Sequence, residues 1–135
     1  MNKTGQCYDA LNRQYQTLYP DQTSTGTAYD GDGRRIAQTN HESVVTLVGY
    51  DGAGRLTSVT NAYETSNQIV TQYTYDEAGN ETNQTDALTN ITIYAYDDVG
   101  RRISLILPGR QAQTFGYDLD GNLVLQTKWQ RPYCE

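Results

Sequence analysis

The sequence predicts an all-β protein, an antiparallel β-hairpin meander of about six repeats of 21 residues. The first observation behind this prediction is a recurring Tyr-Asp-x-x-Gly motif, with copies that begin at Tyr29, Tyr50, Tyr75, Tyr96 and Tyr117. These tyrosines are 21, 25, 21 and 21 residues apart. The second observation is that each repeat contains two strand-like runs separated by turn signals. The third is an amino-acid composition rich in tyrosine and threonine.

That composition predicts β-structure with a thin core. Leu, Ile, Val and Phe together account for only 24 of 135 residues, a share that is typical of disordered chains. The net charge is only −6, however, and 12 Tyr and 18 Thr offset the apolar deficit. Both residue types favour strands whose surface is half exposed to water.

A sixth, degraded copy lies 21 residues before Tyr29, where Tyr8-Asp9 is followed by Asn12 in the glycine position. Asparagine is, after glycine, the residue that best tolerates a positive φ, so the substitution supports the repeat register. We therefore predict one repeat array over residues 1–135, with repeats that start near residues 8, 29, 50, 75, 96 and 117 and a C-terminal tail at 128–135.

One repeat illustrates the predicted elements. Residues 91–96 form a β-rich run, Asp97 to Gly100 a loop, residues 101–107 a second run, and residues 108–110 a second turn. Two strands of ~6 residues and two short loops fill such a repeat, whereas a helix does not fit between turn signals so closely spaced. The chain should therefore contain about 12 strands.

The Asp-x-x-Gly segment predicts a specific hairpin loop. The aspartate opens a type I turn and accepts hydrogen bonds from backbone N–H groups, and the glycine takes the left-handed conformation of a G1 bulge. This geometry places each aspartate opposite the residue after the glycine. The expected pairs are Asp30 with Arg34, Asp51 with Arg55, and Asp97 with Arg101, while Asn80 and Asn122 offer a hydrogen bond instead.

The same geometry places each motif tyrosine opposite the residue two positions beyond the glycine. Tyr50 should face Leu56, Tyr117 should face Leu123 and Tyr75 should face Glu81. Where Tyr29 meets Arg35 and Tyr96 meets Arg102, we expect the guanidinium to lie over the ring. Residues two positions before the tyrosines share their face, and we expect them to stack into a ladder that holds the sheet together: Thr27, Val48, Tyr73, Tyr94 and Phe115.

The second connection of each repeat is less regular in sequence. Its copies include Tyr19-Pro20-Asp21, Asn40-His41-Glu42 and Pro108-Gly109-Arg110. The four extra residues between Tyr50 and Tyr75 should fall in this loop, around residues 64–68, because insertions collect at one edge of a repeat stack.

Charge and hydropathy exclude several classes of protein. The sequence pI is about 4.6 and there is no basic stripe, so we expect no nucleic-acid partner. No apolar run approaches ~18 residues, and the start of the chain lacks the apolar segment of a signal peptide. We expect Cys7 and Cys134, at opposite ends of the chain, to be free or interchain thiols.

The sequence predicts neither a calcium site nor an acid–base catalytic site. Asp30 to Gly33, Asp97-Asp98 and Asp118 to Asn122 resemble pieces of a calcium loop, but they lack the further oxygens and distal glutamate that such a loop needs. His41 is the only histidine, and it lies in a loop without a recognisable nucleophile motif. We therefore predict no catalytic residue, no cofactor-binding residue, no metal site and no enzyme activity.

The motif Tyr-Asp-x-x-Gly-Arg-Leu, clearest at Tyr50 to Leu56, resembles the YD repeat of Rhs (rearrangement hotspot) proteins. The same repeat occurs in wall-associated bacterial proteins, toxin-complex shell subunits and teneurins, and the resemblance covers roughly residues 8–127. It implies a curved single-layer sheet, a segment of the hollow Rhs β-shell that in bacterial toxins encloses a C-terminal effector. It also implies a secreted or cell-surface location.

The resemblance implies a function and partners as well. The function would be that of a non-catalytic structural segment, and the partners would be further YD repeats or an associated toxin polypeptide. Six repeats cannot close a shell, and the Asp-Pro dipeptide of the family's self-cleavage site is absent, so we expect a segment of a larger Rhs protein. The alternatives are a cell-surface or carbohydrate-binding module and a truncated, non-functional fragment. The uncovered sheet edges also predict edge-to-edge self-association.

Overall fold

In a computed structural model of the chain, residues 3–109 and 111–127 are described, and they form twelve β-strands and no helix. The prediction of an all-β meander is confirmed. The strands are β1 (Gly5–Tyr8), β2 (Gln14–Leu18), β3 (Ser24–Tyr29), β4 (Arg35–Thr39), β5 (Val45–Tyr50), β6 (Leu56–Asn61), β7 (Ile69–Tyr75), β8 (Glu81–Thr85), β9 (Ile91–Tyr96), β10 (Arg102–Leu107), β11 (Gln111–Tyr117) and β12 (Leu123–Gln126).

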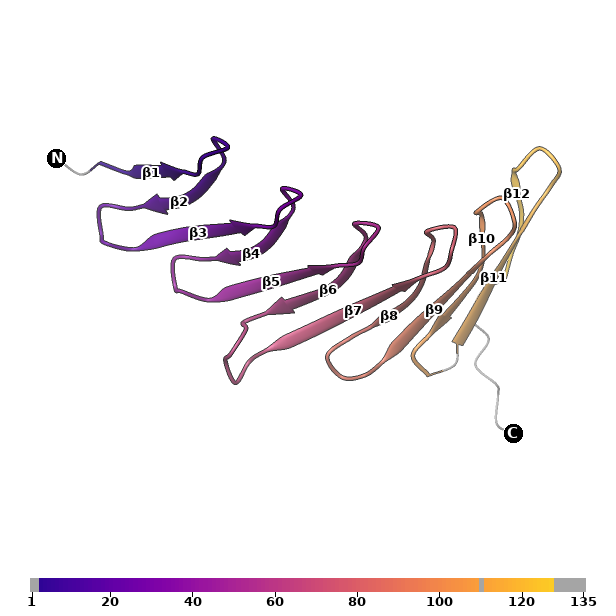
Figure 1. The fold of residues 1–135 in the computed structure, drawn as a ribbon. Coiled ribbons are helices and arrows are strands. Elements are labelled where there is room, and N and C mark those ends of the chain that lie inside the picture. The colour runs from indigo at the N-terminus through magenta and orange to yellow at the C-terminus, as the bar shows by residue number, and fades with distance from the viewer. Residues whose placement is uncertain (1–2, 110, 128–135) are drawn as a thin grey trace. The chain divides into compact units, whose positions relative to one another are not determined.

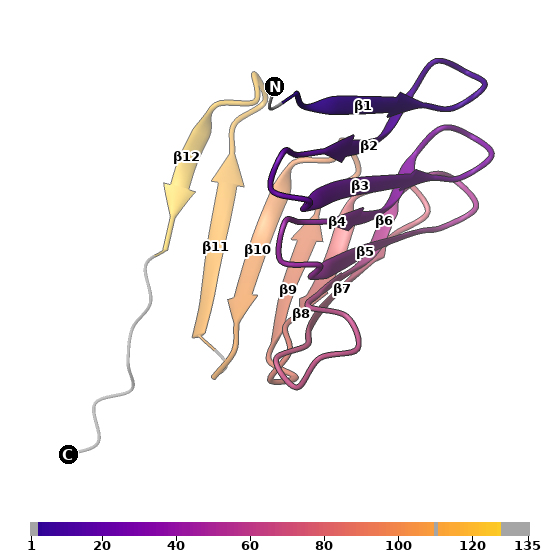
Figure 2. The same ribbon diagram turned by 90° about the vertical axis from the view of Figure 1, so that its left-hand side faces the viewer.

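The chain divides into two compact units, Met1–Val70 and Thr71–Glu135, and the boundary falls within β7. Within each unit the strand order follows the chain and every pair is antiparallel. In the first unit the β1–β2, β3–β4 and β5–β6 loops lie side by side at one end of the strands, and the β2–β3 and β4–β5 loops lie at the other (Figures 1 and 2). The prediction of a single array over residues 1–135 remains a prediction.

The strand register agrees with the predicted cross-strand pairs. Tyr50 pairs with Leu56, and the other motif tyrosines pair with the residue at the same offset, including Tyr8 with Gln14. In these pairings the register shifts next to the motif tyrosine or its partner, so a bulge recurs at the same place in each hairpin. The remaining predicted pairs are also present: Tyr29 with Arg35, Tyr75 with Glu81, Tyr96 with Arg102 and Tyr117 with Leu123.

The Asp-x-x-Gly loops have the predicted type I turn and G1 bulge. In the β3–β4 loop the N–H of Gly33 donates to the carbonyl of Asp30 (3.1 Å), and the N–H of Asp30 donates to the carbonyl of Arg34 (2.9 Å). Gly33 has a φ of 83°, and Asn12 takes the same left-handed conformation with a φ of 61°. The degraded first copy therefore forms the same loop as the others.

Three of the second connections, which looked irregular in sequence, form this same loop without glycine. Gln22, Ser43 and Thr89 occupy the left-handed position, with φ values of 69°, 62° and 63°. In the β8–β9 loop, for example, the N–H of Thr89 donates to the carbonyl of Asp86 (3.0 Å). These three second connections thus share the turn type of the Asp-x-x-Gly loops, although they lack the glycine that identifies it in the sequence.

The extra residues between Tyr50 and Tyr75 lie where they were predicted. They lengthen the loop between β6 and β7, which covers residues 62–68. The longer loop has its own left-handed residues, Ala62 and Glu64, and the N–H of Tyr63 donates to the carbonyl of Val45 (2.9 Å). The insertion therefore leaves the pairing of the flanking hairpins unchanged.

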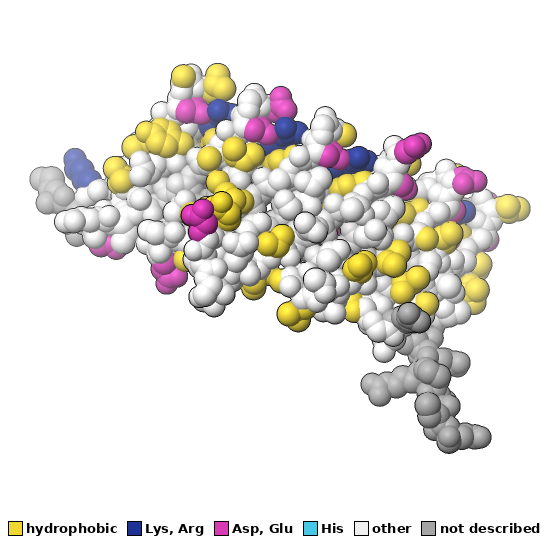
Figure 3. All heavy atoms as spheres, turned by 60° about the horizontal axis from the view of Figure 1, so that its bottom comes forward, with side chains coloured by type: hydrophobic (Ala, Val, Ile, Leu, Met, Phe, Trp, Pro, Cys, Tyr) yellow, Lys and Arg dark blue, Asp and Glu magenta, His cyan; other side chains and the backbone are white. Residues whose placement is uncertain are grey.

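No side chain in the described part of the chain is buried, so the thin core predicted from composition is confirmed in an extreme form. Hydrophobic side chains on the face shown in Figure 3 form separate small patches. Stability must then come from the strand hydrogen bonds and from contacts between half-buried side chains. None of the described segments is a helix that could cross a bilayer.

Candidate functional site

Each aspartate that opens a hairpin loop is held by several hydrogen bonds from its own loop. Asp51 accepts bonds from the N–H groups of Ala53 and Arg55, both at 2.9 Å, and from Nε of Arg55 at 2.7 Å. The backbone bond from Arg55 and then its side-chain bond hold the pKa of Asp51 below the ordinary value of 3.8, against a smaller effect of burial. The hydrogen-bonding capacity of these carboxylates is therefore used to stabilise their own loops.

The arginine that binds the loop aspartate also covers the tyrosine of the following repeat. The Cζ atom of Arg34 lies 5.1 Å from the centroid of the Tyr50 ring. The equivalent distances are 4.6 Å from Arg13 to Tyr29 and 4.7 Å from Arg101 to Tyr117. Each arginine thus joins its own hairpin loop to the next repeat through a cation–π contact.

The hydroxyl group of the same tyrosine makes a second contact between repeats. Tyr50 donates to the backbone carbonyl of Arg35 (3.1 Å), and Tyr117 donates to that of Arg102 (2.9 Å). Tyr29 donates in the same way to the carbonyl of Gln14 (3.1 Å). We call this combination, an arginine over the ring and a carbonyl bonded to the hydroxyl, the inter-repeat clamp.

This arrangement corrects the predicted position of the arginines. Tyr29 is covered by Arg13 rather than Arg35, and Arg102 lies over Tyr94 and Phe115 (5.6 and 5.9 Å) rather than Tyr96. The directly opposite residue does not reach over the ring, whereas the arginine of the preceding loop does. A spacing of sixteen residues between Arg and the covered Tyr is the sequence signal that could have shown it.

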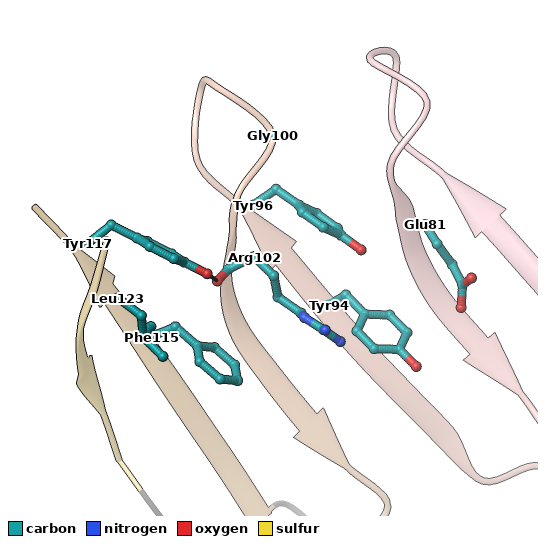
Figure 4. A pocket seen from close by; sticks show the side chains of 8 residues that line it. All are labelled: Glu81, Tyr94, Tyr96, Gly100, Arg102, Phe115, Tyr117 and Leu123. Carbon is teal, nitrogen blue, oxygen red and sulfur yellow. Dashed lines mark hydrogen bonds between the residues drawn. The ribbon is translucent and has the colours of Figure 1, made fainter. Parts of the chain in front are cut away.

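In the second unit, two rings of the predicted aromatic ladder, Tyr94 and Phe115, are linked by the arginine that lies between them. The Arg102 side chain lies between Tyr94 and Phe115 in an open recess of about 550 Å³ (Figure 4). Tyr94, Tyr96, Phe115 and Tyr117 all line this recess, so they share a face as predicted. Burial, and then the charge of Glu81, raise the pKa of Tyr94.

The acidic loop residues and His41 do not gather around a common point in the described part of the chain. Among the described residues, no group of three or more His, Cys, Asp or Glu side chains could hold a metal ion. The ring of His41 packs against that of Tyr19, with centroids 4.2 Å apart and planes tilted by 45°, and its Nδ1 lies 3.4 Å from Oγ1 of Thr23. Cys7 is a free thiol, whereas Cys134 lies outside the described residues.

The fold and the inter-repeat clamp define a repetitive β-sheet protein whose hairpin repeats are joined to their neighbours. The RHS Repeat family model matches residues 29–66 and 75–112, and the chain belongs to this family. No curated protein matches the sequence.

Solved structures of toxin complexes share the fold. A crystal structure of TcdB2-TccC3-TEV aligns with a TM-score of 0.72 and 17% identity over 90% of this chain. A structure of the Photorhabdus luminescens Tc holotoxin pore aligns with a TM-score of 0.65 and 23% identity over 78% of the chain. A crystal structure of TcdB2-TccC3 without the hypervariable C-terminal region aligns with a TM-score of 0.71 and 19% identity over 90% of this chain. The aligned region spans only 7%, 5% and 7% of those chains.

Proposed function

We propose that these repeats form part of an Rhs shell that encloses a polypeptide cargo and contributes to its delivery, and that they have no catalytic activity of their own. The observation that carries the proposal is the inter-repeat clamp. Its arginines and tyrosines join neighbouring hairpins, and the loop aspartates, which repeat as regularly, are used to hold those arginines and their own turns. The family match and the shared fold of the toxin-complex structures support this function.

Protection of a cargo from protease tests the proposal. The full-length protein that contains these repeats would be treated with protease, and the digestion of the segment that follows the repeats would be followed over time. We expect that segment to resist digestion, and to lose its resistance when Gly54 and Gly100 are both replaced by valine to disrupt a hairpin in each unit. A following segment that is cleaved equally fast in both proteins would contradict enclosure.

Carbohydrate binding, the alternative function, stays a prediction, as does edge-to-edge association. The recess in Figure 4 has the aromatic and charged groups that a sugar site uses, but Arg102 already lies over two of its rings. Sugar stacking needs free ring faces, and an arginine already covers three of the four aromatic rings of this recess, those of Tyr94, Phe115 and Tyr117, so the architectural role is favoured.

A further inference from the structure

One repeat lacks the arginine of the inter-repeat clamp. Asn80 stands where the other clamps have Arg13, Arg34 and Arg101, and Tyr96 follows it at the same spacing of sixteen residues. Within the described part of the chain, no guanidinium lies over the Tyr96 ring and no carbonyl accepts a hydrogen bond from its hydroxyl. The clamp is therefore incomplete at this tyrosine.

The Asn80 side chain is turned back into its own loop and leaves the ring uncovered. Its Nδ2 donates to Oδ2 of Asp76 at 2.9 Å. Its Oδ1 lies 3.6 Å from the position that a Cβ atom would have on Gly100, the glycine of the next loop. In the complete clamp at Tyr117, Nη1 of Arg101 lies at a similar distance, 3.7 Å, from the corresponding Cβ position on Gly121. Asparagine thus reaches the neighbouring loop as arginine does, but it has no planar group to lay over the tyrosine.

An open recess of about 560 Å³ lies where the guanidinium is missing. Three of its eight lining residues are aspartates, none is a lysine or arginine, and Asn80, Tyr96 and Gly100 line it as well. Asp97 is bound by Nε of Arg101 at 2.7 Å, whereas the Asp98 side chain is exposed. A tyrosine ring beside carboxylates attracts a cation, and a planar cation can lie flat against the ring.

We propose that this recess binds the guanidinium group of an arginine side chain supplied by a partner polypeptide. The bound group takes the place that an arginine of this chain takes at Tyr29, Tyr50 and Tyr117, where the Cζ-to-centroid distances are 4.6, 5.1 and 4.7 Å. The proposal rests on the geometry of the incomplete clamp and does not depend on the shell function.

The test is a titration of the full chain with Nα-acetyl-arginine amide, in which backbone amide chemical shifts are measured by NMR. Nα-acetyl-citrulline amide, which has nearly the same shape and no charge, is the comparison ligand. We expect saturable shifts for the arginine probe that are concentrated at residues 76–80 and 96–100, and no comparable shifts for the citrulline probe.

Two variants test the location. Asn80→Arg should fill the recess from within the chain and reduce the response to the level of the citrulline probe, and Tyr96→Leu should do the same by removing the ring. Asn122→Arg is the matched control, because Asn122 occupies the same loop position in the last repeat, and it should leave the response unchanged. An undiminished response in Asn80→Arg, or equal responses to both probes, would overturn the proposal.

Discussion

The guanidinium of Arg34 lies over the ring of Tyr50 while its Nε binds Asp30 at 2.7 Å. One side chain therefore fixes its own hairpin loop and holds the next repeat. Because no described residue is buried, such contacts and the strand hydrogen bonds carry the stability that a hydrophobic core supplies elsewhere. Interactions of this kind are local, so each repeat should depend chiefly on its two neighbours.

Replacing Gly100 by valine should destabilise the β9–β10 hairpin by at least about 1–2 kcal/mol, because a β-branched residue would have to adopt a left-handed backbone. The φ of Gly100 is 80°. Chemical denaturation monitored by circular dichroism measures the effect. Gly52→Ala is the control, since a Cβ there meets no atom within 4 Å. Equal denaturation midpoints for both variants would contradict the assigned loop.

Replacing Thr89 by glycine should stabilise the protein by about 0.5–1 kcal/mol, because the relief of left-handed strain exceeds the entropy that glycine loses on folding. Thr89 has a φ of 63° at the glycine position of the β8–β9 loop. The same substitution at Thr92, inside β9, should lower the denaturation midpoint instead. A lower midpoint for both variants would argue against the shared loop geometry.

Replacing Tyr50 by phenylalanine should lower the free energy of unfolding by about 0.5–1.5 kcal/mol, because the bond to the Arg35 carbonyl is lost while the ring under Arg34 remains. Tyr8→Phe is the matched control. Among the described residues, the Tyr8 hydroxyl donates to the Gln6 side chain alone, and 50% of Tyr8 is exposed. If the two variants lose equal stability, the hydroxyl bond does not hold repeats together.

Acid should destabilise the protein through the loop aspartates. The folded-state pKa of Asp118 lies below its ordinary value of 3.8, because the side chain and then the backbone of Asn122 donate hydrogen bonds to the carboxylate. A lowered folded pKa means that this stabilisation is present above the unfolded pKa and is lost as the pH falls through the folded pKa.

Thermal melting between about pH 5 and pH 2 measures this effect, and the melting temperature should fall most below about pH 4. Asp51→Asn, which removes one of the titrating carboxylates, should melt lower at neutral pH but show a smaller further fall in acid. A melting temperature that does not depend on pH in this range would show that the aspartates do not stabilise the fold.

The repeat register and the Asp-x-x-Gly loops could be predicted from sequence because both depend on local backbone rules. Asp30, Gly33 and Arg34 interact within five residues of chain. The clamp could not be predicted from such rules, since Arg34 and Tyr50 meet only after a second loop places their strands side by side. The loops at Ser43 and Thr89 were missed because the left-handed position there carries no glycine.

The incomplete clamp at Tyr96 has a different origin. The change from arginine to asparagine at position 80 is visible in sequence, and both residues were expected to bind the loop aspartate. Asn80 does bind Asp76, so the loop prediction is confirmed. The sequence pattern of the loop does not show that the arginine also covers the tyrosine ring of the next repeat. The geometry of the other clamps reveals this contact, and with it the Tyr96 ring that Asn80 leaves uncovered.

The absence of buried side chains from residues 3–109 and 111–127 should also shape the response to mechanical force. Within each compact unit, hairpins that are held mainly by their neighbours should separate one after another under load. Pulled from its ends, the protein should unzip in successive small events. Each event would free one repeat of about 21 residues, an extension on the order of 70 Å.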